Sequence, residues 1–208
     1  MPTEPMSTRS ATTAARRAAI LTSARKVFIR DGYHAARLSD IAQGAGCSVG
    51  SLYTYFEDRD ALLSAVLDQM ELEMRTRNRS LDWRGGSVEE TKEAIRQANR
   101  AYLETFQRNA AEMVLLEQVA LSEPAFHKQR QERARRFVQR NAGMIEQLQE
   151  AGLVNGTDDA EMLSAALSVM VSRLAYNAFI SGNFLEGSSL ERLAKTVDQV
   201  WFRALGLE

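Results

Sequence analysis

The stretch LSDIAQGAGCSVGSLYTYF, residues 38–56, decides how this chain folds. Leu38 and Ile41 sit at helical spacing and predict a first short helix with one apolar face. Gly46 allows the positive φ that a sharp turn between two helices requires. Ser48 can cap a second helix, because its hydroxyl accepts a hydrogen bond from a free backbone N–H. We interpret this stretch as a helix-turn-helix, a layout whose second helix enters the major groove of DNA.

The rest of the chain predicts an all-α protein. Only three prolines and twelve glycines interrupt the 208 residues, so long helices are easy to place and strands are not. Helical periodicity predicts about nine helices, with an N-terminal three-helix group and a larger C-terminal bundle. The expected parts are a disordered tail over 1–10, a helix-turn-helix domain over 11–57, a connecting helix over 58–81 and a larger domain over 82–208. Three helix starts are expected from a polar cap with an acidic residue three positions later: Ser87 with Glu90, Asp158 with Glu161 and Ser188 with Glu191.

Charge is distributed unevenly along the chain. The formal net charge is −1, but residues 1–56 hold seven basic and three acidic side chains, and the remainder is acidic. A basic segment on an acidic body favours a polyanionic partner for that segment. The polar face of the first predicted helix carries side chains that are either solvated or in contact with phosphate: Arg16, Arg17, Arg25 and Lys26. A later basic run is interpreted as a solvated face, with contact to an anionic effector as the alternative: Lys128, Arg130, Arg133, Arg135, Arg136 and Arg140.

The cysteine content and the hydropathy pattern indicate where the protein works. Cys47 is the only cysteine, so no internal disulfide is possible, which is typical of a reducing compartment. The first ten residues are polar, and no apolar segment of a signal peptide follows them. The longest apolar stretch, residues 165–180, contains Arg173 and Asn177 and is expected to be too polar to cross a bilayer. We therefore expect a soluble, cytoplasmic protein without a membrane partner.

Residues suited to catalysis or metal binding are sparse. His34 and His127 are the only histidines, and neither has a partner at metal-ligand spacing. No Gly-rich phosphate loop and no nucleophile motif is present. Glu117 and His127 could meet in a helical bundle and hold a metal, which is the enzyme-like alternative. We expect a protein that is not an enzyme, with no catalytic residues, no metal and no cofactor.

Residues 24–67 carry a motif that extends beyond the turn itself. Its elements are Phe28, Gly32-Tyr33, Asp40-Ile41-Ala42, Ala45-Gly46, Ser48, Leu52-Tyr53-x-Tyr55-Phe56 and Leu62-Leu63. In residue type and spacing, this segment resembles the N-terminal domain of the tetracycline-repressor (TetR) family. The closing Trp201-x-x-Ala204-Leu205-Gly206 resembles the last helix of many members. The resemblance implies a homodimeric repressor that binds a palindromic operator in double-stranded DNA and responds to a small molecule.

The resemblance also implies which residues meet DNA. Residues 48–56 would form the recognition helix, with Ser48 as its cap and outward positions at Val49, Gly50, Ser51, Tyr53 and Tyr55. Val49 would offer apolar contact, for example to a thymine methyl, and the tyrosine hydroxyls would reach phosphates. Ser39 matches a base-contacting position of some members, while Arg37 and Arg59 would clamp phosphates on either side. Members usually have Thr or Ser before the second helix, whereas this chain has Ala35-Ala36-Arg37, and Arg37 cannot act as a cap.

The same resemblance implies a ligand pocket and a dimer seam in the larger domain. Candidate lining residues are aromatic or flexible, although each could equally be plain core: Tyr102, Phe106, Met113, Leu116, Phe137, Met144 and Tyr176. Such a lining would suit an apolar or amphipathic ligand. The seam would use the last two helices, through small residues that allow close approach and three larger ones: Ala165, Ser168, Ser172, Ala175, Val197, Val200 and Trp201.

Two hypotheses about function remain at this point. The first is a repressor whose ligand moves the connecting helix and spoils the spacing of the two DNA-binding heads, for which a preference of a few kcal/mol suffices. The second is a DNA-binding architectural or protein-partnered factor with no small effector, whose second bundle would be filled by its own side chains.

Overall fold

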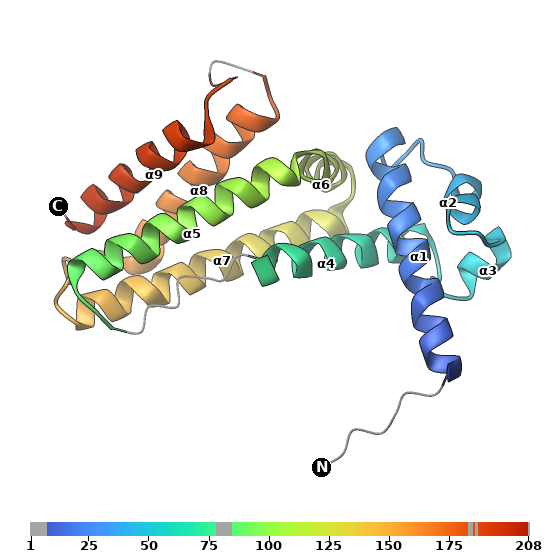
Figure 1. The fold of residues 1–208 in the computed structure, drawn as a ribbon, viewed down its shortest axis with the longest axis horizontal. Helices are drawn as coiled ribbons and strands as arrows, with labels where there is room; N and C mark the ends of the chain where they lie inside the picture. Colours follow the sequence, from blue (N-terminus) through green and yellow to red (C-terminus); the bar gives the residue numbers. More distant parts are fainter. Residues whose placement is uncertain (1–7, 78–84, 183–184, 186, 208) are drawn as a thin grey trace, which may run out of the picture. The chain divides into compact units, whose positions relative to one another are not determined.

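The computed structural model of the protein describes residues 8–77, 85–182, 185 and 187–207. Within these ranges the chain forms nine α-helices and no strand (Figure 1). The helices are α1 (Thr8–Asp31), α2 (Leu38–Gly44), α3 (Val49–Tyr53), α4 (Arg59–Arg77), α5 (Val88–Arg108), α6 (Ala110–Ser122), α7 (Pro124–Glu150), α8 (Ala160–Phe179) and α9 (Leu190–Leu205). The all-α fold class predicted from the periodicity is confirmed.

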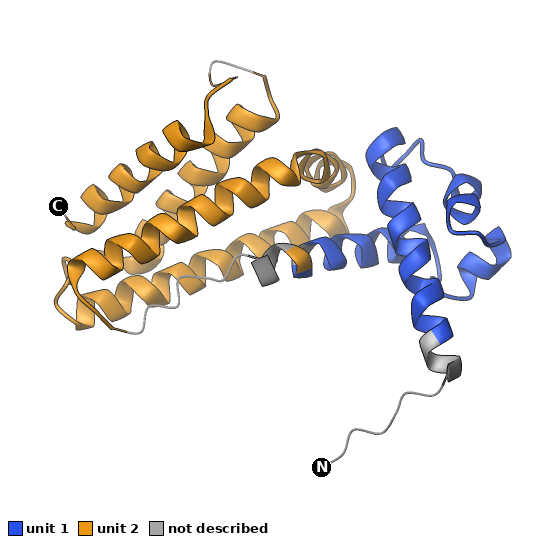
Figure 2. Cartoon of the chain, viewed as in Figure 1, with its two compact units in different colours: residues 1–72 blue, residues 73–208 orange. Residues whose placement is uncertain are grey.

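The chain divides into two compact units, residues 1–72 and residues 73–208, called unit 1 and unit 2 here (Figure 2). The division falls inside α4, which continues from one unit into the other. Helix α1 begins at Thr8, so the last three residues of the predicted tail are helical. The remaining tail residues and the expected end of the connecting helix at Leu81 lie outside the described residues.

Unit 1 is built around one apolar core. Helix α1 packs on α2, and α2 packs on α3. The largest fully buried side chains come from all four helices and include Phe28 of α1, Ile41 of α2, Leu52 of α3 and Leu63 of α4. Their burial removes apolar surface from water, which is the main favourable term in folding. The short helices α2 and α3 therefore depend on tertiary packing, because isolated helices of this length are not stable in water.

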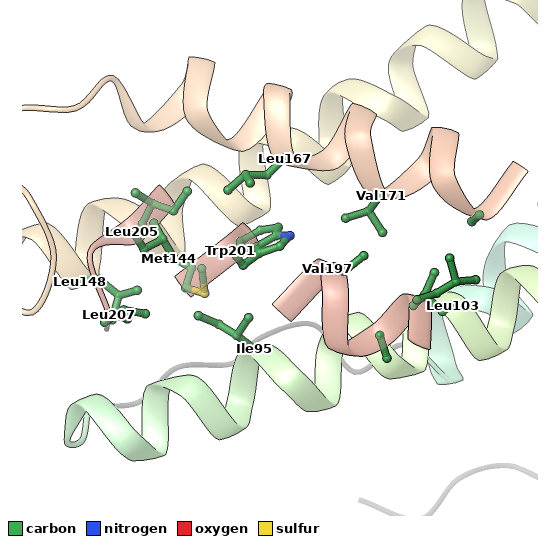
Figure 3. Packing of buried hydrophobic residues seen from close by; sticks show 14 of the residues in the cluster. Ile95, Leu103, Met144, Leu148, Leu167, Val171, Val197, Trp201, Leu205 and Leu207 are labelled. Atoms are coloured by element: carbon green, nitrogen blue, oxygen red, sulfur yellow. The ribbon is translucent and has the colours of Figure 1, made fainter. Parts of the chain in front are cut away.

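Unit 2 is a bundle in which α7 packs on α8, α5 on α9 and α6 on α7. Its core combines side chains from four helices, as Figure 3 shows for Ile95 and Leu103 of α5, Met144 and Leu148 of α7, Leu167 and Val171 of α8, and Val197, Trp201 and Leu205 of α9. Leu207, which follows α9, closes the same cluster. The last helix is thus an integral part of the protomer core.

The helix starts expected from the sequence are confirmed in one case and shifted in two. Ser87 forms the predicted capping box: its hydroxyl accepts from the Glu90 N–H at 3.3 Å, and its own N–H donates to the Glu90 carboxylate at 2.8 Å. Helices α8 and α9 start one residue later than predicted, with Asp159 and Ser189 as their N-caps. In both cases a second polar residue directly follows the predicted cap, and that residue carries the extended backbone conformation and makes the capping bond.

Helix α8 is the one helix among the described residues that is long and apolar enough to cross a bilayer by length and composition. Composition alone therefore does not exclude a span, contrary to the expectation that the polar residues in this stretch would do so. The fold accounts for part of its apolar character, because Leu167, Val171 and Ala175 are buried in the bundle core, and 33% of the apolar window is buried in all.

Candidate nucleic-acid interface

The turn between α2 and α3 is closed by backbone hydrogen bonds of the Schellman type. The Cys47 N–H donates to the Ala42 carbonyl at 2.9 Å, and the Gly46 N–H donates to the Gln43 carbonyl at 3.0 Å. Gly46 adopts φ +64°, the left-handed conformation that only glycine adopts at little cost. The glycine predicted from the sequence as the turn residue has this role, and it sets the direction in which α3 leaves α2.

Helix α3 begins with the predicted cap and ends sooner than predicted. The Ser48 hydroxyl accepts a hydrogen bond from the Ser51 N–H at 3.1 Å. The helix spans Val49–Tyr53, whereas a rod over residues 48–56 was expected. After Tyr53 the chain tightens, because the Thr54 N–H bonds the Ser51 carbonyl three residues back rather than one four residues back. The segment expected to be the recognition helix is therefore a short helix followed by a tight turn.

The two faces of α3 differ in burial as the sequence predicted. Leu52 is fully buried and anchors the helix to the core of unit 1, as does Phe56 in the following turn. On the other face, Val49 is 36% exposed and Tyr53 is 50% exposed. The remaining predicted contacts on this element are exposed at Ser48, Gly50 and Ser51 and half-buried at Tyr55. Unit 1 thus presents a small, mostly polar surface around two exposed larger side chains.

Ser39 and Arg37 lie at the start of α2, and both are exposed. Arg37 occupies the N-cap position of α2 and makes no side-chain capping bond there, as predicted. Its charge contributes to the acidity of Asp31, whose pKa is lowered first by a hydrogen bond from Arg30 and further by the positive charges of Arg30 and Arg37. The Arg37 guanidinium is therefore a cation at the surface of unit 1, free to approach a phosphate.

Arg59 is placed differently from Arg37. Its guanidinium carbon lies 4.5 Å above the centre of the Tyr33 ring, in a cation–π contact. Two of its nitrogens, Nε and Nη2, are buried and have no hydrogen-bond partner in the described part of the chain. The neighbouring Tyr33 hydroxyl donates to the Asp60 carboxylate. The phosphate contact predicted for Arg59 would therefore fall to Nη1 while the guanidinium stays on the Tyr33 ring.

Helix α1 contributes contacts to this element that the sequence did not assign. Arg16 Nη1 donates to the carbonyls of Ala45 at 3.2 Å and Gly46 at 3.1 Å, both in the turn. The buried Ser23 hydroxyl donates to the Ile41 carbonyl of α2 at 2.8 Å. The only signal for this pair in the sequence is spacing, because Arg16 and Ser23 are two helical turns apart on one side of α1.

Unit 2 brings three of the predicted effector residues together. The Tyr102 ring lies 6.1 Å from the Phe106 ring on the same helix and 5.6 Å from the Phe137 ring on α7, measured between centroids. Burial raises the pKa of the Tyr102 hydroxyl above its ordinary value, while a hydrogen bond with Ser172 acts in the opposite direction. These rings form an aromatic cluster with one polar group, called the ring cluster here.

The other predicted effector residues are distributed over the bundle. Phe106 and Met144 are buried in the core, and Met113 and Tyr176 are half-buried against it. Leu116 is half-buried on α6. The structure also shows a hollow of about 480 Å³ elsewhere, between α5 and α9, whose lining includes Arg96, Arg100, Asp198 and Phe202. None of the predicted effector residues lines this groove.

The residues predicted for the dimer seam separate into two groups. Ala175, Val197 and Trp201 are fully or almost fully buried within one protomer, as is Ser168 at 7% exposed. They face the core because α8 and α9 pack on other helices of the same chain, so they are not available to a partner in this structure. Ala165, Ser172 and Val200 remain partly or fully exposed. The outward apolar residues of α8 are instead Met162 and Val169, each 67% exposed.

The enzyme-like alternative gains no support from the placement of its residues. Glu117 accepts an ion-pair hydrogen bond from Arg130, and His127 bonds the Gln131 side chain at 2.9 Å. Among the described residues, no group of three or more His, Cys, Asp or Glu side chains is arranged to hold a metal ion.

A capped, exposed helix set by a tight turn on a helical core is the arrangement of helix-turn-helix proteins that bind DNA. The model of a family described as "Bacterial regulatory proteins, tetR family" matches residues 20–66, and that of "Transcriptional regulator EthR, C-terminal domain" matches residues 95–205. The chain belongs to the TetR family of DNA-binding transcriptional regulators.

Individual relatives agree with this family. The chain is similar to the regulator EthR of Mycolicibacterium smegmatis, with 23% identity over 191 residues that cover 91% of this chain and 86% of EthR. It is 42% identical to the Escherichia coli K12 regulator RutR over 62 residues, and this match spans only 30% of the chain and 29% of RutR.

Solved structures share the fold over most of the chain. A protein from Mesorhizobium loti, described as a TetR-family transcriptional regulator, has a TM-score of 0.74 at 19% identity, and the match covers 93% of this chain and 96% of that one. The fatty acid degradation regulator FadR from Bacillus halodurans has a TM-score of 0.70 at 18% identity, covering 92% and 95%.

Proposed function

We propose that this protein is a cytoplasmic, homodimeric repressor that reads a near-palindromic operator with α3 and is released from it by an apolar or amphipathic ligand. The observation that carries the proposal is the exposed surface of α3, with Val49 and Tyr53 outward and Leu52 anchored inward. Ser39 and Arg37 flank this surface on α2, and Ser48, Gly50, Ser51 and Tyr55 complete it. Two copies of α3 must sit about one DNA turn, 34–36 Å, apart to read such a site.

Selection of bound fragments from a random pool of double-stranded DNA tests the proposal directly. We expect a near-palindromic sequence to emerge. With that duplex, Tyr53→Phe combined with Tyr55→Phe should weaken binding to selected and random DNA alike, because phosphate contacts carry no sequence information. Wild-type affinity in the double variant would remove the role given to the two hydroxyls. Failure of the wild-type protein to prefer any sequence would contradict the proposed function itself.

Homodimer formation is assigned to the outward face of α8. Met162 and Val169 lie seven residues apart, two helical turns, so they share one side of the helix with the exposed Ala166. Exposed apolar patches on soluble proteins commonly mark interfaces. Val169→Glu should yield a monomer by analytical ultracentrifugation, with an unchanged circular dichroism spectrum and operator affinity at least about a hundredfold weaker, since one half-site is lost. A Val169→Glu dimer would contradict this assignment.

The ring cluster of Tyr102, Phe106 and Phe137 supports an apolar ligand with a polar group. Because one structural neighbour is a fatty acid degradation regulator, fatty acids are suitable first probes. A fatty acid should lower operator affinity in wild-type protein, and Phe137→Ala should weaken this response while leaving ligand-free operator affinity intact. If no apolar or amphipathic ligand among a broad panel changes operator binding, the protein acts without a small effector.

A further inference from the structure

We propose that Arg16 is a positioning residue for DNA recognition: it holds the turn before α3 and makes no contact with phosphate. The inference rests on the proposed role of α3 in reading DNA. The Arg16 side chain starts from α1, before the first residue of the matched TetR model, and reaches residues 45 and 46 in the turn. It acts on the direction of α3 through the backbone that carries this helix.

The hydrogen-bond pattern of the turn explains why a side chain is needed there. At the end of α2, the Ala42 and Gln43 carbonyls accept the N–H groups of Cys47 and Gly46 and so close the turn. The chain then changes direction at Gly46, and the helical pattern that supplies an N–H to each carbonyl ends. Arg16 Nη1 donates to the carbonyls of Ala45 and Gly46, two and three residues after Gln43. One guanidinium nitrogen thus bridges both peptide groups of the corner.

A second contact from α1 fixes α2 itself. The Ser23 hydroxyl donates to the Ile41 carbonyl, and a Cβ added at Gly44 would lie only 2.4 Å from the Ser23 oxygen. Because α2 approaches α1 this closely, it cannot shift toward α1. Arg16 holds the turn that follows α2, two residues before the Ser48 cap of α3. A small change at this corner alters the angle of α3 and misplaces Val49 and Ser51 relative to base edges.

Salt dependence distinguishes a positioning residue from a phosphate contact. Removal of a phosphate contact lowers the slope of log K against log salt by about one unit per half-site and weakens all sequences alike. Removal of a positioning residue leaves the slope unchanged and reduces the preference for the correct sequence. Arg37→Met is the matched control, because it removes one positive charge from the same unit at a residue assigned to phosphate.

The test uses the full-length protein, the duplex selected by the wild type and a random-sequence duplex of equal length. Arg16→Met should lower the ratio of selected to random affinity about tenfold per half-site, the effect of losing one charge-assisted contact in each subunit, with a wild-type salt slope. In the free protein, amide hydrogen exchange at Gly46, Cys47 and Ser48 should become faster. Arg37→Met should keep the wild-type ratio of selected to random affinity and lower the slope of log K against log salt.

Arg16→Lys keeps the charge, but its ammonium ends one bond short of the guanidinium nitrogens. Arg16→Lys should lower the ratio of selected to random affinity while affinity for the random duplex stays at the wild-type value. This variant replaces Arg16→Met if circular dichroism shows that the Met variant is unfolded. The proposal is overturned if the Arg16 variants keep the wild-type ratio of selected to random affinity. It is also overturned if they show a lower salt slope and lose the same affinity for both duplexes. If the wild-type protein binds both duplexes equally well, the proposed function fails. If the wild-type protein prefers the selected duplex and the Arg16 variants prefer it to the same degree, only this inference fails.

Discussion

Unit 1 and unit 2 differ in the chemistry of their interiors. In the part of unit 1 that the structure describes, Ser23 is the one buried serine, threonine, amide or acidic side chain, and the other buried polar atoms belong to the Tyr33 hydroxyl and the Arg59 guanidinium. The described part of unit 2 buries Thr91, Asn99, Thr105, Glu112, Asn141, Ser164, Ser168 and Asn177. A buried polar group is costly unless a partner satisfies it. Unit 1 therefore offers a firm support for a functional surface, whereas unit 2 has polar chemistry inside.

The polar groups of unit 2 join helices to one another. The Ser164 hydroxyl of α8 donates to the Val138 carbonyl of α7 at 2.8 Å, and the Asn99 amide of α5 donates to the Asp198 carboxylate of α9 at 2.9 Å. Such contacts fix the relative position of two helices more specifically than apolar packing does. Under the proposed function, a ligand that enters the bundle selects a different arrangement of the helices by replacing one of these bonds. Under the proposed function, this contrast suits unit 1 to presenting the DNA-binding surface and unit 2 to responding to a ligand.

The largest expected effect separates the stability of the two units. Phe28 is fully buried in unit 1, so Phe28→Ala should cost about 3–5 kcal/mol by creating a cavity. Denaturation followed by Trp201 fluorescence, in a Trp83→Phe background, reports on unit 2, while the loss of operator binding reports on unit 1. We expect the Trp201 transition to stay near its wild-type midpoint. If both signals shift together, the units unfold as one and the comparison fails.

Substitutions at two glycines, one in each unit, compare the units through smaller expected changes in stability. Gly44→Ala in unit 1 should cost about 1–3 kcal/mol, since the new Cβ would lie 2.4 Å from the Ser23 hydroxyl oxygen. Ser23→Ala should remove this cost, because the nearest remaining atom, the Ser23 Cβ, is then 3.4 Å away. Urea denaturation of the two single variants and the double variant gives the coupling. Additive effects would show that the two positions are independent.

Gly143→Ala in α7 is the matched change in unit 2. Nothing lies within 4 Å of the added Cβ, and the residue is in the interior of a helix. The substitution should therefore stabilise the protein by about 0.5–1 kcal/mol, since alanine loses less backbone entropy than glycine on folding. Urea denaturation measures this gain. A destabilised Gly143→Ala would mean that α7 is packed more tightly there than the structure indicates.

The smallest effect concerns charge in the groove of unit 2. Burial raises the pKa of Asp198 above its ordinary value of 3.8, against the hydrogen bond from Asn99 and the positive charge of Arg96. An acid with a raised pKa in the folded state destabilises the fold as pH rises through that pKa and has no such effect below its unfolded value. Asp198→Asn should raise Tm at pH 7, by less than the shift of about 2–4 °C that a 1 kcal/mol change produces.

The pH dependence provides the control for this prediction. Glu93 also contributes to the rise in the pKa of Asp198. Hydrogen bonds from Gln97 and Arg96 lower the pKa of Glu93 itself, so its charge stabilises the fold and Glu93→Gln should lower Tm at pH 7. At pH 3 the gain from Asp198→Asn should vanish, as measured by thermal denaturation. An equal gain at both pH values would indicate that hydrogen bonding, and not charge, limits stability at this position.

Local chemistry was predictable from the sequence, and contacts distant along the chain were not. Gly46 and Ser48 were identified because a tight turn and a helix cap each need a particular residue type at one position. The bond from Arg16 to Gly46 joins residues thirty apart, and no local pattern encodes it. The same limit applies to Val197 and Trp201: helical spacing predicts that they share a face, but only the packed bundle shows that both are buried within this chain.

The division between the units has a consequence for engineering. Because it falls after Leu72, within helix α4, the chain passes from one unit to the other as an α-helix. One residue inserted there would rotate everything downstream by about 100° and advance it by about 1.5 Å, whereas seven residues complete nearly two full turns. Chimeras that replace unit 1 with the DNA-binding domain of another protein should therefore preserve the helical phase of α4 at the junction. If the proposed ligand response is correct, fusions that change the helical phase should lose this response even when both parts fold.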